Sequence, residues 1–194
     1  TTVFSDNVGD LLPGRNATYF SFEAGQTGNH SGYLELSFDN NDDDPDDYLE
    51  LTIDFLDPVT SLSFSILDID GSPQAFWDDA VEVFYDGINV RTDATLFVRG
   101  PDVFFDNEAG IFGFESGSRS ADFDETNGNV DFDFGTRTIN QIRIRYLSTD
   151  DAVDDPSAQF IGIGDLAFVP EPGGAYLLLL AAASGIAWRK RRGS

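Results

Sequence analysis

Residues 48–71 read YLELTIDFLDPVTSLSFSILDIDG, and apolar side chains occupy every second position on both sides of Asp57-Pro58. Successive side chains of a β-strand point to opposite faces of a sheet, so this alternation indicates strands with one buried and one exposed face. The stretch therefore predicts two antiparallel strands, residues 48–55 and a second strand that begins near Leu62, separated by Asp57-Pro58.

The same period of two recurs along most of the chain before residue 169, between turns rich in Gly, Pro, Asn and Asp. No amphipathic helix pattern interrupts it. The last such run, residues 159–168, changes face near Gly164-Asp165, and a β-bulge there would let both of its apolar pairs face the core. Together these runs predict an all-β, jelly-roll-like antiparallel sandwich. The alternating runs are residues 33–38, 48–55, 62–66, 81–85, 130–134, 142–146 and 159–168.

Two neighbouring runs carry opposite charges on their exposed faces, Asp131 and Asp133 on one and Arg143 and Arg145 on the next. This pattern predicts cross-strand charge pairs between them.

The chain is strongly acidic, with 35 Asp and Glu against 11 Lys and Arg and a net charge of −24. Such a charge repels nucleic acid and anionic lipid and attracts divalent cations, so we expect no nucleic-acid partner. Cysteine is absent, which excludes a disulfide framework and a thiolate metal site. His30 is the only histidine, so we identify no catalytic residues and expect a non-enzymatic protein.

Asp68 is the most informative single residue in the body of the chain. Strict alternation places it on the same face as Leu62, Phe64 and Ile66, which buries a carboxylate unless a cation or hydrogen bonds compensate it. The spacing Asp68-x-Asp70-Gly71 is that of an EF-hand loop, but Pro73 stands at the position that requires glycine. No helical pattern flanks the loop, so the sequence predicts no EF-hand.

The last 26 residues have three parts: Val169-Pro170-Glu171-Pro172, an uncharged apolar segment 175–188, and the basic run 189–192. Residues 173–188 would form a helix of about 24 Å, slightly shorter than the roughly 30 Å hydrocarbon core of a bilayer. We expect a single transmembrane helix with its basic end in the cytoplasm and residues 1–168 outside. Because the chain begins with Thr1, we expect its N-terminus to be already processed.

This three-part tail resembles the PEP-CTERM sorting signal of bacterial surface and secreted proteins. The resemblance implies an exosortase-type membrane protease as a partner, cleavage near the Pro-Glu-Pro element, and delivery to the cell surface or an exopolysaccharide-rich matrix. It divides the chain into an extracellular sandwich, residues 1–168, and a sorting segment, residues 169–194. The sorting residues are Val169, Pro170, Glu171, Pro172, Arg189, Lys190, Arg191 and Arg192.

Residues 57–87 resemble the extracellular sandwich domains of such proteins and, more loosely, galactose-binding-like jelly rolls. In those domains an Asp-x-Asp loop and a later Asp hold a structural calcium ion. The resemblance implies a Ca²⁺ ion held by Asp68, Asp70 and Asp79, with Asp78 as a substitute. By the same resemblance Glu23 and Asp165 are further candidates.

The leading expectation is a calcium-stabilised surface protein that acts in adhesion or in association with extracellular polysaccharide. One alternative is a glycan-binding module in which Phe76, Trp77, Tyr85 or Tyr146 stacks on sugar rings. The other is a polysaccharide hydrolase, because the many carboxylates offer pairs for acid–base catalysis.

Overall fold

The computed structural model describes residues 2–6, 18–23, 32–38, 48–72, 77–105, 113–116, 125–149, 152 and 159–171. In these parts the chain is all-β, with one short 3₁₀ helix. The elements are β1 (Thr2–Asp6), β2 (Thr18–Glu23), β3 (Tyr33–Phe38), β4 (Tyr48–Leu67), β5 (Asp79–Tyr85), β6 (Ile88–Asn89), η1 (Val90–Thr92), β7 (Phe97–Arg99), β8 (Val103–Phe105), β9 (Phe114–Ser116), β10 (Val130–Asp133), β11 (Ile139–Ser148) and β12 (Gln159–Pro170).

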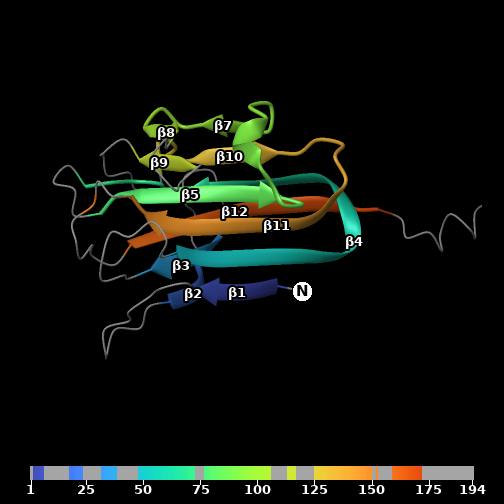
Figure 1. The fold of residues 1–194 in the computed structure, drawn as a ribbon, viewed down its shortest axis with the longest axis horizontal. Coiled ribbons are helices and arrows are strands. Elements are labelled where there is room, and N and C mark those ends of the chain that lie inside the picture. The colour runs from blue at the N-terminus through green and yellow to red at the C-terminus, as the bar shows by residue number, and fades with distance from the viewer. Residues whose placement is uncertain are drawn as a thin grey trace, which may run out of the picture.

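Strand β4 is a single strand of 20 residues that bends and serves both layers of the fold (Figure 1). In its first half Ile53 lies between Thr2 of β1 and Ile142 of β11. In its second half Ile66 lies between Val130 of β10 and Ile163 of β12. The prediction of two separate strands was therefore wrong at residues 56–61, where the strand turns without ending.

The pairings define two antiparallel layers joined by β4. One layer contains β1, the first half of β4, β11, β5, β9 and β8. The other contains β2, β3, β12, the second half of β4, β10 and β7. The predicted all-β antiparallel sandwich is confirmed at this level.

The core lies between the two layers and is built from the alternating apolar positions of their strands. Leu51 and Leu62 are fully buried, one from each half of β4. Phe64 stacks on Phe132 of the neighbouring β10 with ring centroids 4.8 Å apart, and Phe114 from the opposite layer meets Phe132 edge-on at 5.8 Å. Burial of each such side chain stabilises the fold by about 1.5–3 kcal/mol.

Strand β12 contains the predicted bulge, between Gly164 and Ala167, and Asp165 has a φ of 53°. Only one of its two apolar pairs faces the core, however. Ile161 and Ile163 are buried, whereas Leu166 and Phe168 are 43% and 42% exposed. Beyond Gly164 β12 no longer pairs with β3, and the bulge shifts its register against β4.

The chain stays in the sheet beyond Phe168, past the expected boundary between the sandwich and the sorting segment. Val169 and Pro170 pair with Thr60 and Val59 of β4, and the Glu171 amide donates to the Pro58 carbonyl at 2.9 Å. Pro172, the apolar segment 175–188 and the basic run 189–192 lie outside the described residues. Among the residues that are described, no helix is long and apolar enough to cross a membrane.

The bend of β4 offers a test of backbone strain. Ser61 is exposed and has a φ of 51°, a left-handed conformation that costs a non-glycine residue about 1–2 kcal/mol. Ser61→Gly should therefore raise the free energy of unfolding by about 0.5–1 kcal/mol, measured by urea denaturation. The matched control is Ser63→Gly, two residues further along β4, which should lower it by a similar amount. Equal effects of the two substitutions would contradict this account of the bend.

Candidate functional site

The buried aspartates between β4 and β5 form the first candidate site. Asp68, Asp70, Asp78 and Asp79 are 5%, 8%, 6% and 1% exposed, which is unusual for carboxylates. The backbone brings them together, because Gly71 and Asp78 form an isolated bridge and the Asp79 amide donates to the Asp70 carbonyl at 2.9 Å. The prediction that Asp68 is buried is confirmed.

Hydrogen bonds hold the Asp79 carboxylate on both oxygens. Oδ1 accepts from the Tyr146 hydroxyl at 2.7 Å and Oδ2 from the Asp70 amide at 3.4 Å. Asp70 in turn accepts from Trp77 Nε1 at 2.8 Å. Burial raises the pKa of Asp79 well above its usual value, and the charges of Asp70 and Asp68 raise it further, while the Tyr146 hydrogen bond lowers it.

Asp78 accepts hydrogen bonds from different residues than Asp79 does. Its Oδ2 accepts from Thr149 Oγ1 at 2.6 Å, and its Oδ1 accepts from the Ser116 hydroxyl. Asp78 therefore ties the start of β5 to β11 and β9. Gly71 lies next to the same contacts. A Cβ at this position would lie 2.3 Å from Ser116 Oγ, which is too close for a side chain without a shift of Ser116.

The structure brings together three of the five predicted calcium ligands. Asp68, Asp70 and Asp79 influence one another electrostatically, but oxygens of Asp70 and Asp79 already accept hydrogen bonds from the protein. Asp165 is exposed on β12, where the preceding Gly164 pairs with Ser65 of β4. Glu23 pairs with Tyr33, which also pairs with Gly164, so it lies near Asp165 in register.

Within the described ranges, no three His, Cys, Asp or Glu side chains are arranged so that they could hold a metal ion. The carboxylates of Asp70, Asp78 and Asp79 are compensated by hydrogen bonds from Trp77, Thr149, Ser116 and Tyr146. None of these hydrogen bonds goes to Asp68, whose buried Oδ1 has no hydrogen bond among the described residues. Calcium binding stays a prediction.

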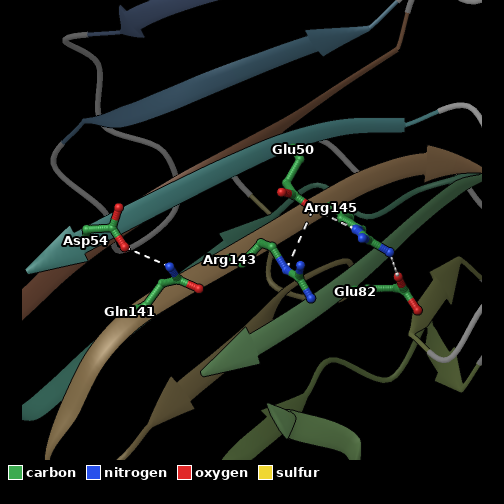
Figure 2. Close-up of polar contacts among 6 residues, drawn as sticks. All are labelled: Glu50, Asp54, Glu82, Gln141, Arg143 and Arg145. Carbon is green, nitrogen blue, oxygen red and sulfur yellow. Dashed lines mark hydrogen bonds and ion pairs between the residues drawn. The ribbon is translucent and has the colours of Figure 1, made fainter. Parts of the chain in front are cut away.

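The second candidate site is the outer face of the layer formed by β4, β11 and β5 (Figure 2). Arg145 of β11 lies opposite Glu50 of β4 on one side and Glu82 of β5 on the other. Its Nε lies 2.7 Å from Glu50 Oε2 and its Nη1 3.4 Å from Glu82 Oε2. We call this surface, made of Tyr48, Glu50, Asp54, Glu82, Phe84, Gln141, Arg143 and Arg145, the polar face.

Arg143 and Gln141 extend the polar face along β11. Arg143 Nε lies 3.6 Å from the same Glu50 oxygen that Arg145 contacts, so one carboxylate serves two guanidinium groups (Figure 2). At that distance the Arg143 Nε makes no hydrogen bond, and among the described residues it has no other acceptor. Gln141 Nε2 donates to Asp54 Oδ1 at 2.7 Å.

Two aromatic rings lie under the guanidinium groups. Arg143 lies over Phe84 at 4.3 Å from the ring centroid, and Arg145 lies over Tyr48 at 4.5 Å. Such contacts are worth about 0.5–1 kcal/mol each at exposed sites. The arginine side chains are largely covered, with 29% and 27% of their surface exposed.

The sequence predicted charge pairs for Arg143 and Arg145 but with the wrong partners. Asp131 and Asp133 lie on β10, which pairs with the second half of β4 and with β7 in the other layer. The observed partners, Glu50 and Glu82, come from strands that are neighbours in space but distant in sequence. Their only sequence signal is that they occupy the outward positions of alternating runs.

The aromatic residues proposed for sugar stacking have other environments. Tyr146 is fully buried, and the half-buried Tyr85 meets Phe134 edge-on at 5.4 Å. Trp77 is half-buried and hydrogen-bonded to Asp70, while Phe76 lies outside the described residues. The alternative of sugar stacking on Tyr146 was therefore wrong, because its ring belongs to the core.

Comparisons with known proteins do not assign a family. No family model matches the chain, and no curated protein matches it. Among solved structures it is similar to a carbohydrate-binding module of the β-sandwich superfamily, at 10% identity and a TM-score of 0.42 over 87% of this chain. The chain spans 56% of the length of that structure.

A second similar structure is the module GH31 CBM32-2 bound to GalNAc, at 14% identity and a TM-score of 0.37, covering 88% of this chain and 98% of the other. At this level both similarities concern the β-sandwich arrangement alone and carry no conclusion about function.

The raised pKa of Asp79 predicts a pH dependence. The folded protein holds the Asp79 proton more tightly than the unfolded chain, so this contribution to stability is full below about pH 3.8 and is lost as pH rises through the folded pKa. Acidification from pH 7 towards pH 4 should therefore raise the melting temperature. Asp79→Asn should flatten this slope, whereas Asp57→Asn, which removes an exposed charge, should leave it nearly unchanged. Equal slopes in the two variants would exclude Asp79 as the cause.

Tyr146→Phe should destabilise the buried aspartates. It removes the hydroxyl donor of Asp79 and leaves a buried carboxylate oxygen without that partner, at a cost of about 1–3 kcal/mol in the free energy of unfolding. Chemical denaturation at pH 7 measures the loss, and the stability gained on acidification should be larger than in the parent protein. Tyr85→Phe is the matched control, because among the described residues the Tyr85 hydroxyl has no hydrogen bond. A loss of similar size in both variants would show that the Tyr146 contact is unimportant.

Proposed function

We propose that the chain is a non-catalytic glycan-binding domain that binds a saccharide on its polar face. The observation that carries the proposal is that ion pairs and a hydrogen bond hold side chains of three adjacent strands in one surface (Figure 2). Guanidinium–ring contacts with Phe84 and Tyr48 add to this order. Because these side chains are ordered by one another, binding would lose little side-chain entropy.

The chemistry of the polar face suits a sugar. A saccharide presents hydroxyl groups that both donate and accept hydrogen bonds, together with apolar C–H faces. The carboxylates of Glu50, Glu82 and Asp54 are acceptors only, while the guanidinium of Arg143 is a donor only. The Arg143 Nε is buried, but 29% of the side chain is exposed, so the exposed part of its guanidinium group is a donor that a sugar hydroxyl can reach.

The charge of the polar face separates it from the rest of this acidic chain. Two arginines lie among its three carboxylates, so its charges largely cancel where the whole chain carries −24. A neutral glycan would meet less repulsion than an anionic one at such a surface. The two similar solved structures are carbohydrate-binding modules by description, but the proposal does not depend on them.

The C-terminal sequence also suggests where in or around the cell the domain would act. We propose, from the tail alone, that the domain is exported, sorted by an exosortase-type protease, and retained at the cell surface or in extracellular polysaccharide. We also propose that a structural calcium ion is held by Asp68, Asp70 and Asp79. Adhesion through matrix glycans would then follow from glycan binding.

Arg143→Ala tests the polar face directly. A glycan array identifies a ligand for the parent protein, and titration calorimetry then measures its affinity for each variant. A hydrogen bond to a charged group contributes about 1.5–3 kcal/mol, so the variant should bind about 10-fold more weakly or worse.

Arg137→Ala is the matched control, because it removes another half-exposed arginine, one paired with Asp93 on a different part of the surface. It should leave affinity unchanged. Absence of any array signal for the folded parent protein, or equal losses in the two variants, would refute binding at the polar face.

A further inference from the structure

Exposed apolar side chains gather at the end of the sandwich where the chain leaves the sheet. Leu56 on the bend of β4 is 93% exposed, and Phe168 and Val169 near the end of β12 are 42% and 54% exposed. Phe168 meets Phe55 edge-on at 5.2 Å, which joins the two elements. We call Leu56, Phe168 and Val169 the exit surface.

The exit point of the chain is held beside this surface. The Glu171 amide donates to the Pro58 carbonyl at 2.9 Å, and Glu171 Oε1 accepts from Thr138 Oγ1 at 2.8 Å. The strand end therefore cannot swing away from the bend of β4 without losing both bonds. Every residue of the exit surface lies within three positions of Pro58 or Glu171 along the chain.

The sequence after Glu171 limits how far the apolar segment 175–188 lies from the exit surface. Three residues, Pro-Gly-Gly, separate Glu171 from Ala175. At no more than about 3.6 Å per residue, Ala175 lies within about 14 Å of Glu171. The segment carries no charge and is followed by four cations, the pattern of a span with an anchored end.

We propose that the exit surface rests in the interface of a phospholipid bilayer that segment 175–188 enters. As a helix the segment is about 21 Å long, against a hydrocarbon core of about 30 Å, and a short span draws its flanking residues towards the membrane. The headgroup layer on each side is about 5–8 Å thick. A connection of at most about 14 Å lets the exit end of the domain rest against that layer, with Leu56 in the membrane interface.

Charge selects the kind of lipid surface. Asp57 is exposed next to Leu56, and the chain carries −24 overall, so an anionic bilayer would repel this end. The occupant is a zwitterionic interface. The strands of both layers run from the exit end to the opposite end of the sandwich (Figure 1). In this arrangement they would be steeply inclined to the membrane surface, with the start of β5 and its buried aspartates away from it.

A single fluorescent label tests the contact. The chain contains no cysteine, so Leu56→Cys in the full-length protein gives one labelling position on a side chain that is almost fully exposed. The protein is placed in phosphatidylcholine vesicles that contain lipids with a quencher at the level of the headgroups. Val98→Cys on β7, 70% exposed and in a strand that pairs with β10 rather than β12, is the control.

The label at position 56 should be quenched several-fold more strongly than the label at position 98. Equal quenching at both positions, or failure of the full-length chain to float with the vesicles, would overturn the proposal. A label at position 56 that is already shielded without vesicles would also overturn it. Shielding independent of protein concentration would assign the surface to segment 175–188, and concentration-dependent shielding would assign it to a second copy of the chain.

A second measurement does not require a label. Leu56→Asp in the full-length chain should lower the fraction that floats with phosphatidylcholine vesicles, whereas Val98→Asp should not. Unchanged flotation of Leu56→Asp would count against contact of Leu56 with lipid, even if the tail inserts.

Discussion

The continuity of β4 across both layers is the constraint on which the rest of the fold depends. Its first half offers hydrogen bonds to β1 and β11 and its second half to β10 and β12, so the position of the bend sets how the two layers face each other. A slip of one residue in either half would turn every buried side chain of that half outward. The bend is held from outside the strand, because Ser61 donates to the Gly135 carbonyl and Pro58 accepts from Glu171.

Strand β4 ends at Leu67 and is followed by a buried, acidic turn that contains Asp68 and Asp70. A buried carboxylate is costly unless it is hydrogen-bonded, and here donors from β11, β9 and Trp77 compensate Asp78, Asp79 and Asp70. These contacts tie the start of β5 to three other parts of the sandwich. The raised pKa of Asp79 reflects the remaining cost, which comes from burial and from the nearby charges of Asp70 and Asp68.

The alternation that builds the core also builds the surface. Outward positions of β4, β11 and β5 bring carboxylates, arginines and an amide into adjacent rows, and each group is held by a neighbour on another strand. This order fixes hydrogen-bond donors and acceptors side by side on one surface. The exit end is chemically different, because its exposed side chains are apolar and lie where the chain leaves the sheet.

Local patterns in the sequence determined the class of fold, the faces of most strands, the burial of Asp68 and the bulge near Asp165, because a period of two and a turn residue act within a few positions. Tertiary structure alone decided that residues 48–67 form one strand, that Leu166 and Phe168 stay exposed, and that Arg145 pairs with Glu50 and Glu82. These outcomes depend on which strands become neighbours. The partners are far apart along the chain, and no local pattern records which of several compatible strands will lie alongside.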